Sequence, residues 1–183
     1  MKKNFAIFCL LSILFVNCMS AGNAGNKNQG FNSEVHGELY IEKNAGFSMY
    51  IPKGWVIKDL GQKYLAVIGP IDNDFAPNIV FVDEQYSGSI SEYVDASIFH
   101  LLNFYADPEI IENEKFITNT GLQGRYITLS GRLNEFHARQ RYYVIQNKKR
   151  TAIMGIIGSA AFASGERYDA LFDECVVTFN WTK

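Results

Sequence analysis

Alternating hydrophobic and polar residues mark the start of the folded part of the chain. Within residues 46–55, Phe47, Met49 and Ile51 alternate with more polar side chains, the period of two that is typical of a strand with one buried face. The proline that follows cannot donate a hydrogen bond to a neighbouring strand, so it ends the strand. Trp55 comes directly afterwards, and its large ring predicts a core position.

The preceding segment has the same period. In residues 38–42, Leu39 and Ile41 are expected to face the core and Tyr40 the solvent, and the turn-like residues 43–46 predict a hairpin with the next strand. Further strands are expected at residues 56–59, 64–69 and 78–82. The last of these is apolar throughout, which predicts a central position in the sheet.

Two segments have helical spacing instead. Residues 89–105 place apolar side chains at intervals of three and four, and Ser89 with Glu92 forms a capping-box pattern. Residues 165–181 repeat the helical spacing, with Cys175 on the apolar face as a small buried side chain. Between the helices, strands are expected at 115–118, 124–132, 136–146 and 151–158. Their short links predict an antiparallel meander.

These elements predict one α+β domain at residues 38–183, in which helices cover an antiparallel sheet. The strand that leads into residues 52–55, the helix that opens at Ser89, and the closing segment 168–179 resemble the Mog1/PsbP-like family. That resemblance implies an α/β/α sandwich around an antiparallel sheet. It also implies a binding or assembly domain without catalytic residues, as in photosystem II extrinsic subunits, a Ran-binding import factor and small bacterial lipoproteins.

The first residues resemble a bacterial lipoprotein signal. A short basic start precedes an apolar run at residues 5–16, too short to span a bilayer. Residues 14–18 resemble a lipobox, with Phe15 and Asn17 at positions that usually hold other residues, which predicts a signal peptide at 1–17 and a diacylglycerol on Cys18. The alternative is cleavage after Ala21 or Ala24, which would release a secreted protein. Residues 18–37 are rich in Gly and Asn and predict a flexible tether.

Composition excludes some classes of partner. The 17 basic and 19 acidic residues give a net charge of −2, so nothing favours nucleic acid. Cys9 lies in the predicted signal peptide and Cys18 is assigned to lipid, so Cys175 has no partner for a disulfide in the mature chain. The sequence therefore predicts a domain whose core is not held by disulfides.

Candidate chemistry is sparse. Asp72 and Asp74 begin a calcium-loop pattern, but the positions that follow lack its further oxygen ligands and glycine, so neither a metal site nor a cofactor is predicted. No motif of nucleophilic catalysis or phosphate binding is present, and the protein is predicted not to be an enzyme.

A basic strand provides the one candidate site. His137, Arg139 and Arg141 are expected on one face of strand 136–146, with Arg125 across from them on the preceding strand. Guanidinium groups there would suit a carboxylate, a phosphate or an acidic partner. The alternative is a solvated face paired with glutamates such as Glu112.

The sequence as a whole predicts a lipid-anchored domain of the bacterial cell envelope. Its expected activity is to bind a protein partner and to assist the assembly or stability of an envelope complex. A small-molecule or divalent-metal-binding lipoprotein is the alternative.

Overall fold

A computed structural model describes residues 37–182, except 62, 148 and 150. Cys18, the predicted signal peptide and all but the last residue of the predicted tether lie outside the described residues. The strands are β1 Leu39–Glu42, β2 Phe47–Tyr50, β3 Val56–Lys58, β4 Ala66–Ile68, β5 Asn78–Gln85, β6 Ala106–Ile117, β7 Gln123–Leu133, β8 Phe136–Asn147, β9 Ala152–Ala161 and β10 Asn180–Trp181. The helices are α1 Ile90–Phe104, the short 3-10 turn η1 Phe162–Ser164 and α2 Gly165–Val176.

Seven strands form the main sheet, in the order β3-β4-β5-β9-β8-β7-β6. Every neighbouring pair is antiparallel, and β6 to β9 form the predicted meander. The apolar strand β5 lies inside the sheet between β4 and β9, as its composition predicts. The antiparallel sheet and its strand order are therefore set by short connections and by which strands are apolar on both faces.

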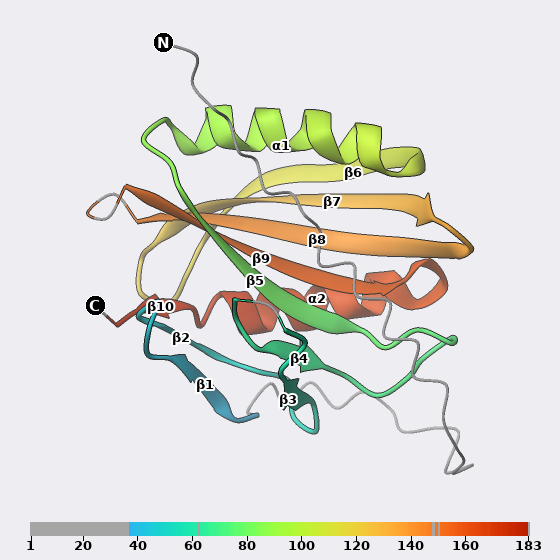
Figure 1. Ribbon diagram of the computed structural model, residues 1–183, viewed down its shortest axis with the longest axis horizontal. Coiled ribbons are helices and arrows are strands. Elements are labelled where there is room, and N and C mark those ends of the chain that lie inside the picture. Colours follow the sequence, from blue (N-terminus) through green and yellow to red (C-terminus); the bar gives the residue numbers. More distant parts are fainter. Residues whose placement is uncertain (1–36, 62, 148, 150, 183) are drawn as a thin grey trace.

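The main sheet is the middle of three layers (Figure 1). Helix α1 covers one face, where Tyr93 and Val94 pack against Ile127 and Val144 of the sheet. Helix α2 and the second sheet, ordered β1-β2-β10, cover the other face. This is the predicted antiparallel sheet flanked by helices.

Helix α1 begins where its sequence indicates. The side chain of Ser89 accepts a hydrogen bond from the backbone N–H of Glu92, and the Glu92 carboxylate accepts one from the backbone N–H of Ser89. This reciprocal capping satisfies two donors that the helix leaves unpaired. Neither α1 nor α2 has the length and hydrophobicity that crossing a membrane requires.

The closing helix is shorter than the predicted segment 165–181. Helix α2 ends at Val176, Phe179 is fully buried, and Asn180 and Trp181 form β10, opposite Ser48 and Phe47 of β2. Pairing with β2 supplies the backbone hydrogen bonds that a longer helix would have made itself. Phe179 fits the helical spacing in the sequence, although it follows the helix, because its side chain enters the same core as those of α2.

The first strand is turned over relative to the prediction. Tyr40 is buried, whereas Leu39 and Ile41 face the solvent. The register pairs Tyr40 with Met49, whose side chain lies in the core, so both point to the same face. Tyr40 can occupy this position because its ring stacks on Phe81 while its hydroxyl donates to Glu42.

Trp55 closes one end of the core beneath α2. Only 9% of the residue is exposed, and its ring meets Tyr168 and Phe172 of the helix edge to face, with centroids 6.2 Å apart in both pairs. A Cβ atom on Gly69 would lie 2.6 Å from the indole, so glycine is needed for the ring to fit. The indole thus joins the turn after β2 to α2.

We expect Trp55→Ala to lower the free energy of unfolding by about 3–5 kcal/mol, because it removes a large buried ring and leaves a cavity. Urea unfolding followed by circular dichroism measures the change. Phe99→Ala on α1 is the control, since Phe99 is 66% exposed and its loss should change stability by less than about 0.5 kcal/mol. Equal effects of the two substitutions would show that Trp55 is not part of the core.

Candidate functional site

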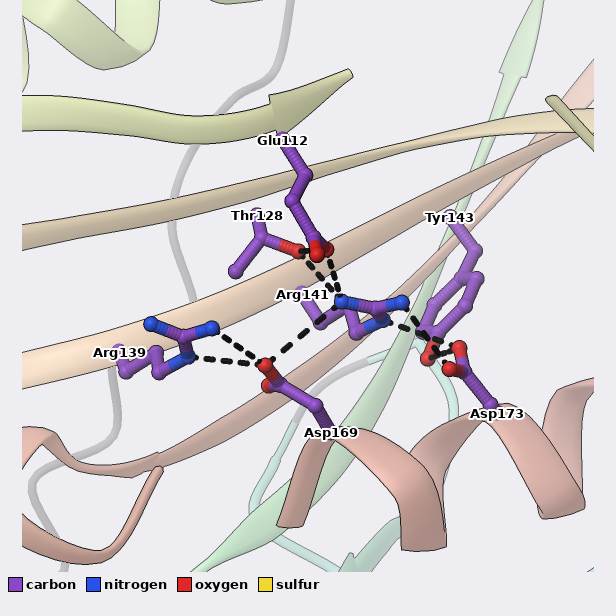
Figure 2. Close-up of polar contacts among 7 residues, drawn as sticks. All are labelled: Glu112, Thr128, Arg139, Arg141, Tyr143, Asp169 and Asp173. Carbon is purple, nitrogen blue, oxygen red and sulfur yellow. Dashed lines mark hydrogen bonds and ion pairs between the residues drawn. The ribbon is translucent and has the colours of Figure 1, made fainter. Parts of the chain in front are cut away.

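Charged and polar side chains from β6, β7, β8 and α2 meet on the face of the sheet that α2 covers (Figure 2). We call this cluster the ion-pair network. Its members are Glu112, Thr128, Arg139, Arg141, Tyr143, Asp169 and Asp173. It includes two of the four residues that the sequence predicts as a binding site.

Matched spacing on a strand and a helix brings the two arginines to two aspartates. Arg139 and Arg141 are two residues apart on β8, about 6.6 Å along a strand. Asp169 and Asp173 are four residues apart on α2, about 6 Å along a helix. The two repeats are nearly equal, so a helix that runs along β8 can present one carboxylate to each guanidinium.

The two pairs are both forked hydrogen bonds. Arg139 Nε and Nη2 donate to Asp169 Oδ2 at 2.9 and 2.7 Å, and Arg141 Nε and Nη2 donate to the two Asp173 oxygens at 2.9 Å each. Gly165 makes room for the first pair, because a Cβ atom there would lie 2.4 Å from Arg139 Cδ. The start of α2 can therefore lie directly on the arginine side chain.

Arg141 is the centre of the network. Its Nη1 donates to Glu112 Oε2 and, at 2.7 Å, to Thr128 Oγ1, and it also lies 3.6 Å from Asp169 Oδ2. The guanidinium covers the ring of Tyr126 at 4.0 Å, the geometry of a cation–π contact. Only 5% of Arg141 is exposed, so nearly all of its charge is compensated inside the protein.

The network carries more negative than positive charge. Two guanidiniums face three carboxylates, so the sum is 2 − 3 = −1 when all are ionised. The side chains of Glu112 and Asp173 are each 40% exposed, whereas that of Arg141 is 6% exposed. A ligand that approaches from solvent meets carboxylates first, so the network is not an open receptor for an anion.

Burial and pairing act differently on the pKa of each acid. Burial tends to raise the pKa of Glu112, but hydrogen bonds from Thr128 and Arg141 outweigh it, and the pKa is lowered. For Asp169 burial is the larger effect, so its pKa is raised despite Arg139. Burial, followed by the Asp173 charge, raises the pKa of Tyr143 well above its usual range. Tyr143 is therefore a neutral donor, and its hydroxyl donates to Asp173 Oδ1 at 2.6 Å.

The structure separates the four predicted binding residues. Arg139 and Arg141 lie together, and His137 is on the same face, exposed and stacked on Phe162 with ring centroids 3.9 Å apart. Arg125 is opposite Val144, so it lies on the other face, where it donates to Ser91 of α1 at 3.1 Å. The expectation that Arg125 lies beside the others is wrong, because residues 125 and 141 have opposite orientations in this register. That the four bind an anion or a partner stays a prediction.

Four members of the network, Thr128, Tyr143, Asp169 and Asp173, are not predicted from the sequence. Asp169 and Asp173 lie in the predicted closing helix, outside the apolar stripe that predicts it. The signal was present as two acids four apart on a helix and two arginines two apart on a strand. What the sequence does not show is that α2 lies along β8.

Asp72, which begins the incomplete calcium-loop pattern, has a structural role. Asp72 accepts a hydrogen bond from Arg167 of α2, and its backbone pairs with that of Phe75 in a tight turn. Within the described part of the chain, no three His, Cys, Asp or Glu side chains are grouped so that they could hold a metal ion.

Solved structures show which fold this is. The cyanobacterial PsbP of Synechocystis sp. PCC 6803 matches with a TM-score of 0.57 at 15% identity, over 85% of this chain and 98% of that chain. LpqN of Mycobacterium tuberculosis, involved in cell envelope biogenesis, gives 0.60 at 12%, over 80% and 90%. The Ran-binding protein Mog1p of Saccharomyces cerevisiae gives 0.58 at 10%, over 80% and 95%.

The chain therefore has the Mog1/PsbP-like fold, as the resemblance in the sequence implied. No protein-family model matches the sequence, and no curated protein is significantly similar to it.

We expect Asp169→Ala to cost about 3–5 kcal/mol of stability, because it leaves the Arg139 guanidinium buried without its partner. Replacing both residues, by Arg139→Met with Asp169→Leu, should restore most of the loss. Arg132→Ala is the matched control, since Arg132 and Asp107 form a pair whose side chains are 58% and 71% exposed, and it should cost less than about 1 kcal/mol. Urea unfolding compares the variants. A loss for Asp169→Ala no larger than for Arg132→Ala would contradict the role of the pair.

The lowered pKa of Glu112 predicts how stability depends on pH. A carboxyl with a lowered folded-state pKa stabilises the protein fully above its ordinary pKa of 4.5, and this contribution is lost as the pH falls through the folded-state value. Glu112→Gln should therefore be less stable than the wild type at pH 7, and the difference should shrink as the pH falls below 4.5. Melting temperatures between pH 3 and 7 measure this difference, and a gap independent of pH would rule out the ionic contribution.

Proposed function

We propose that this protein is a lipid-anchored domain of the bacterial cell envelope that binds a protein partner and assists the assembly or stability of an envelope complex, without catalysis. The observation that carries the proposal is the fold. Proteins with this fold include one described as Ran-binding and one involved in cell envelope biogenesis. The lipobox-like residues 14–18 support an envelope location for this chain.

The ion-pair network supports a binding role over a chemical one. Its two cations are guanidiniums that donate to carboxylates, and its one phenol has a raised pKa and donates to Asp173. Such groups orient a helix on a sheet, whereas a nucleophile or a general base would need a pKa near neutrality. We therefore place the activity on the surface of the domain.

The predicted partner site on the basic strand presents carboxylates and His137 to solvent, and not the two arginines. A partner on this side would contact the exposed His137 and the half-exposed carboxylates of Glu112 and Asp173 before it reached Arg139 or Arg141. A basic or mixed-charge surface would be complementary to those carboxylates.

Fractionation of cells that express the full chain tests the anchor. The wild type should remain in the membrane fraction after a carbonate wash, and Cys18→Ala should be released. A membrane-bound Cys18→Ala variant would contradict lipid anchoring. Cys175→Ala is the control for loss of a cysteine as such, because Cys175 is buried in the domain.

Crosslinking in native membranes, followed by purification of the wild type and of His137→Ala, tests the partner, because His137 is exposed and its loss removes no partner of Arg141. A partner in stoichiometric amount, weakened by the loss of His137, supports the proposal. A melting temperature that rises with a small molecule or a divalent cation, without any crosslinked protein, would favour the alternative ligand-binding lipoprotein.

A further inference from the structure

The outer face of the small sheet carries three apolar side chains that point to solvent. Leu39 is 41% exposed, Ile41 51% and Tyr50 41%, and the register places them on the face opposite the buried Phe47. Ser48 shares this outward side because it alternates with Phe47 in β2. We call Leu39, Ile41, Ser48, Tyr50 and Asn180, which pairs with Ser48, the outer small-sheet face.

The chain enters the domain at the edge of this face. The described residues begin at Gly37, two positions before β1. Gly37 is tightly packed, since a Cβ atom there would lie 2.0 Å from the carbonyl oxygen of Ile51, and the backbone N–H of Ile51 donates to the Glu38 oxygen at 3.0 Å. An anchor on the preceding chain would therefore bring this edge of the small sheet close to the anchoring surface.

The length of chain before Gly37 limits how far the domain can lie from its anchor. Eighteen residues lie between Cys18 and Gly37, and a Gly- and Asn-rich flexible coil of that length has a root-mean-square span of about 25 Å. A tether of this length keeps the two ends at an effective concentration on the order of millimolar. Even a weak affinity of the outer small-sheet face for the anchoring surface would then be sufficient to keep the two in contact.

We propose that the outer small-sheet face lies on the bilayer that holds the Cys18 lipid, with Leu39, Ile41 and Tyr50 at the boundary between headgroups and acyl chains. This inference rests on the lipid anchor of the proposed function. Aliphatic side chains gain from burial at that boundary, and a tyrosine suits it because its ring is apolar and its hydroxyl stays hydrated.

The composition of this face favours a bilayer over a protein. A stable protein interface buries about 800 Å² on each partner, which three half-exposed side chains do not supply. The rim carries both signs of charge, with Glu38 and Lys53 exposed beside the chain entry, so attraction to one sign of headgroup is not required. Apolar contact supported by the tether is the interaction that fits.

This orientation determines which side of the domain faces away from the membrane. Helix α1 covers the opposite side of the main sheet (Figure 1). Its exposed surface, which includes Phe99, would then point away from the bilayer, where a soluble partner can reach it.

Site-specific labels on the full-length lipoprotein, reconstituted in phosphatidylcholine vesicles, test the inference. Ser48→Cys places a polarity-sensitive fluorophore in the outer small-sheet face without removing its apolar side chains, and Asp95→Cys places the same label on the exposed side of α1. The native Cys175 should not react, because burial raises its pKa to about 12. Nitroxide lipids with headgroup labels should quench the label at 48 several-fold more than the label at 95. Adding Leu39→Asp with Ile41→Asp should remove this difference while the melting temperature shows that the domain stays folded.

Three outcomes of this experiment would contradict either the bilayer contact or the lipid anchor. Equal, water-like emission at both positions on vesicles that retain the protein would overturn the inference and leave the anchor intact. Protection of the label at 48 in lipid-free detergent, increasing with protein concentration, would overturn it in favour of a second copy of the chain. Failure of the protein to float with the vesicles, with Cys18 open to thiol reagents, would instead disprove the anchor and with it the proposed function.

Discussion

The buried Arg141 is the constraint on which the arrangement of this domain most depends. A guanidinium removed from water is costly unless every donor has an acceptor, and here carboxylates from β6 and α2 and a hydroxyl from β7 supply them. The apolar contacts of α2 include Phe172, which lies on the backbone of Gly158 and against the ring of Trp55. A shift by one helical turn, about 5.4 Å, would leave Arg139 or Arg141 without its aspartate. We infer that the network fixes the position of α2, while burial provides most of the stability.

The position of α2 in turn determines the small sheet. The chain leaves the helix at Val176 and reaches β10 four residues later, so the helix end sets where β10 can pair with β2. Thr178 strengthens the junction, since its hydroxyl accepts from the backbone N–H of Tyr50 at 2.9 Å. Phe47 then packs between Phe81 of the main sheet, to which its ring is tilted, and Phe179 after the helix, on which its ring stacks. One chain of contacts thus runs from the ion-pair network to the face on which Tyr50 is exposed.

A feature of the fold or of the ion-pair network could be predicted from the sequence when residues close together in the chain determine it. The capped helix α1, the meander and the turn before Trp55 were predicted, because spacing, capping residues and short links determine them within a few positions. The same face for Arg139 and Arg141 was predicted from strand alternation. The sequence does not predict three other features, because each depends on which distant elements pack together. These are the aspartate partners of the two arginines, the position of Arg125 on the opposite face, and the replacement of the last helical turn by β10. Alternation assigns faces within one strand but not the register between strands.

Among the predictions that are wrong, the orientation of β1 is the most informative, because its inward and outward faces are exchanged. Alternation alone places Leu39 and Ile41 inside, yet the register with β2 turns Tyr40 inward and leaves two aliphatic side chains in solvent. Burying Leu39 and Ile41 would gain more apolar area than burying one tyrosine, so stability alone does not favour this arrangement. Proteins depart from locally consistent patterns mainly at functional sites. The exception lies at the edge where the predicted tether joins the domain, which is where contact with the proposed membrane surface would require exposed apolar side chains.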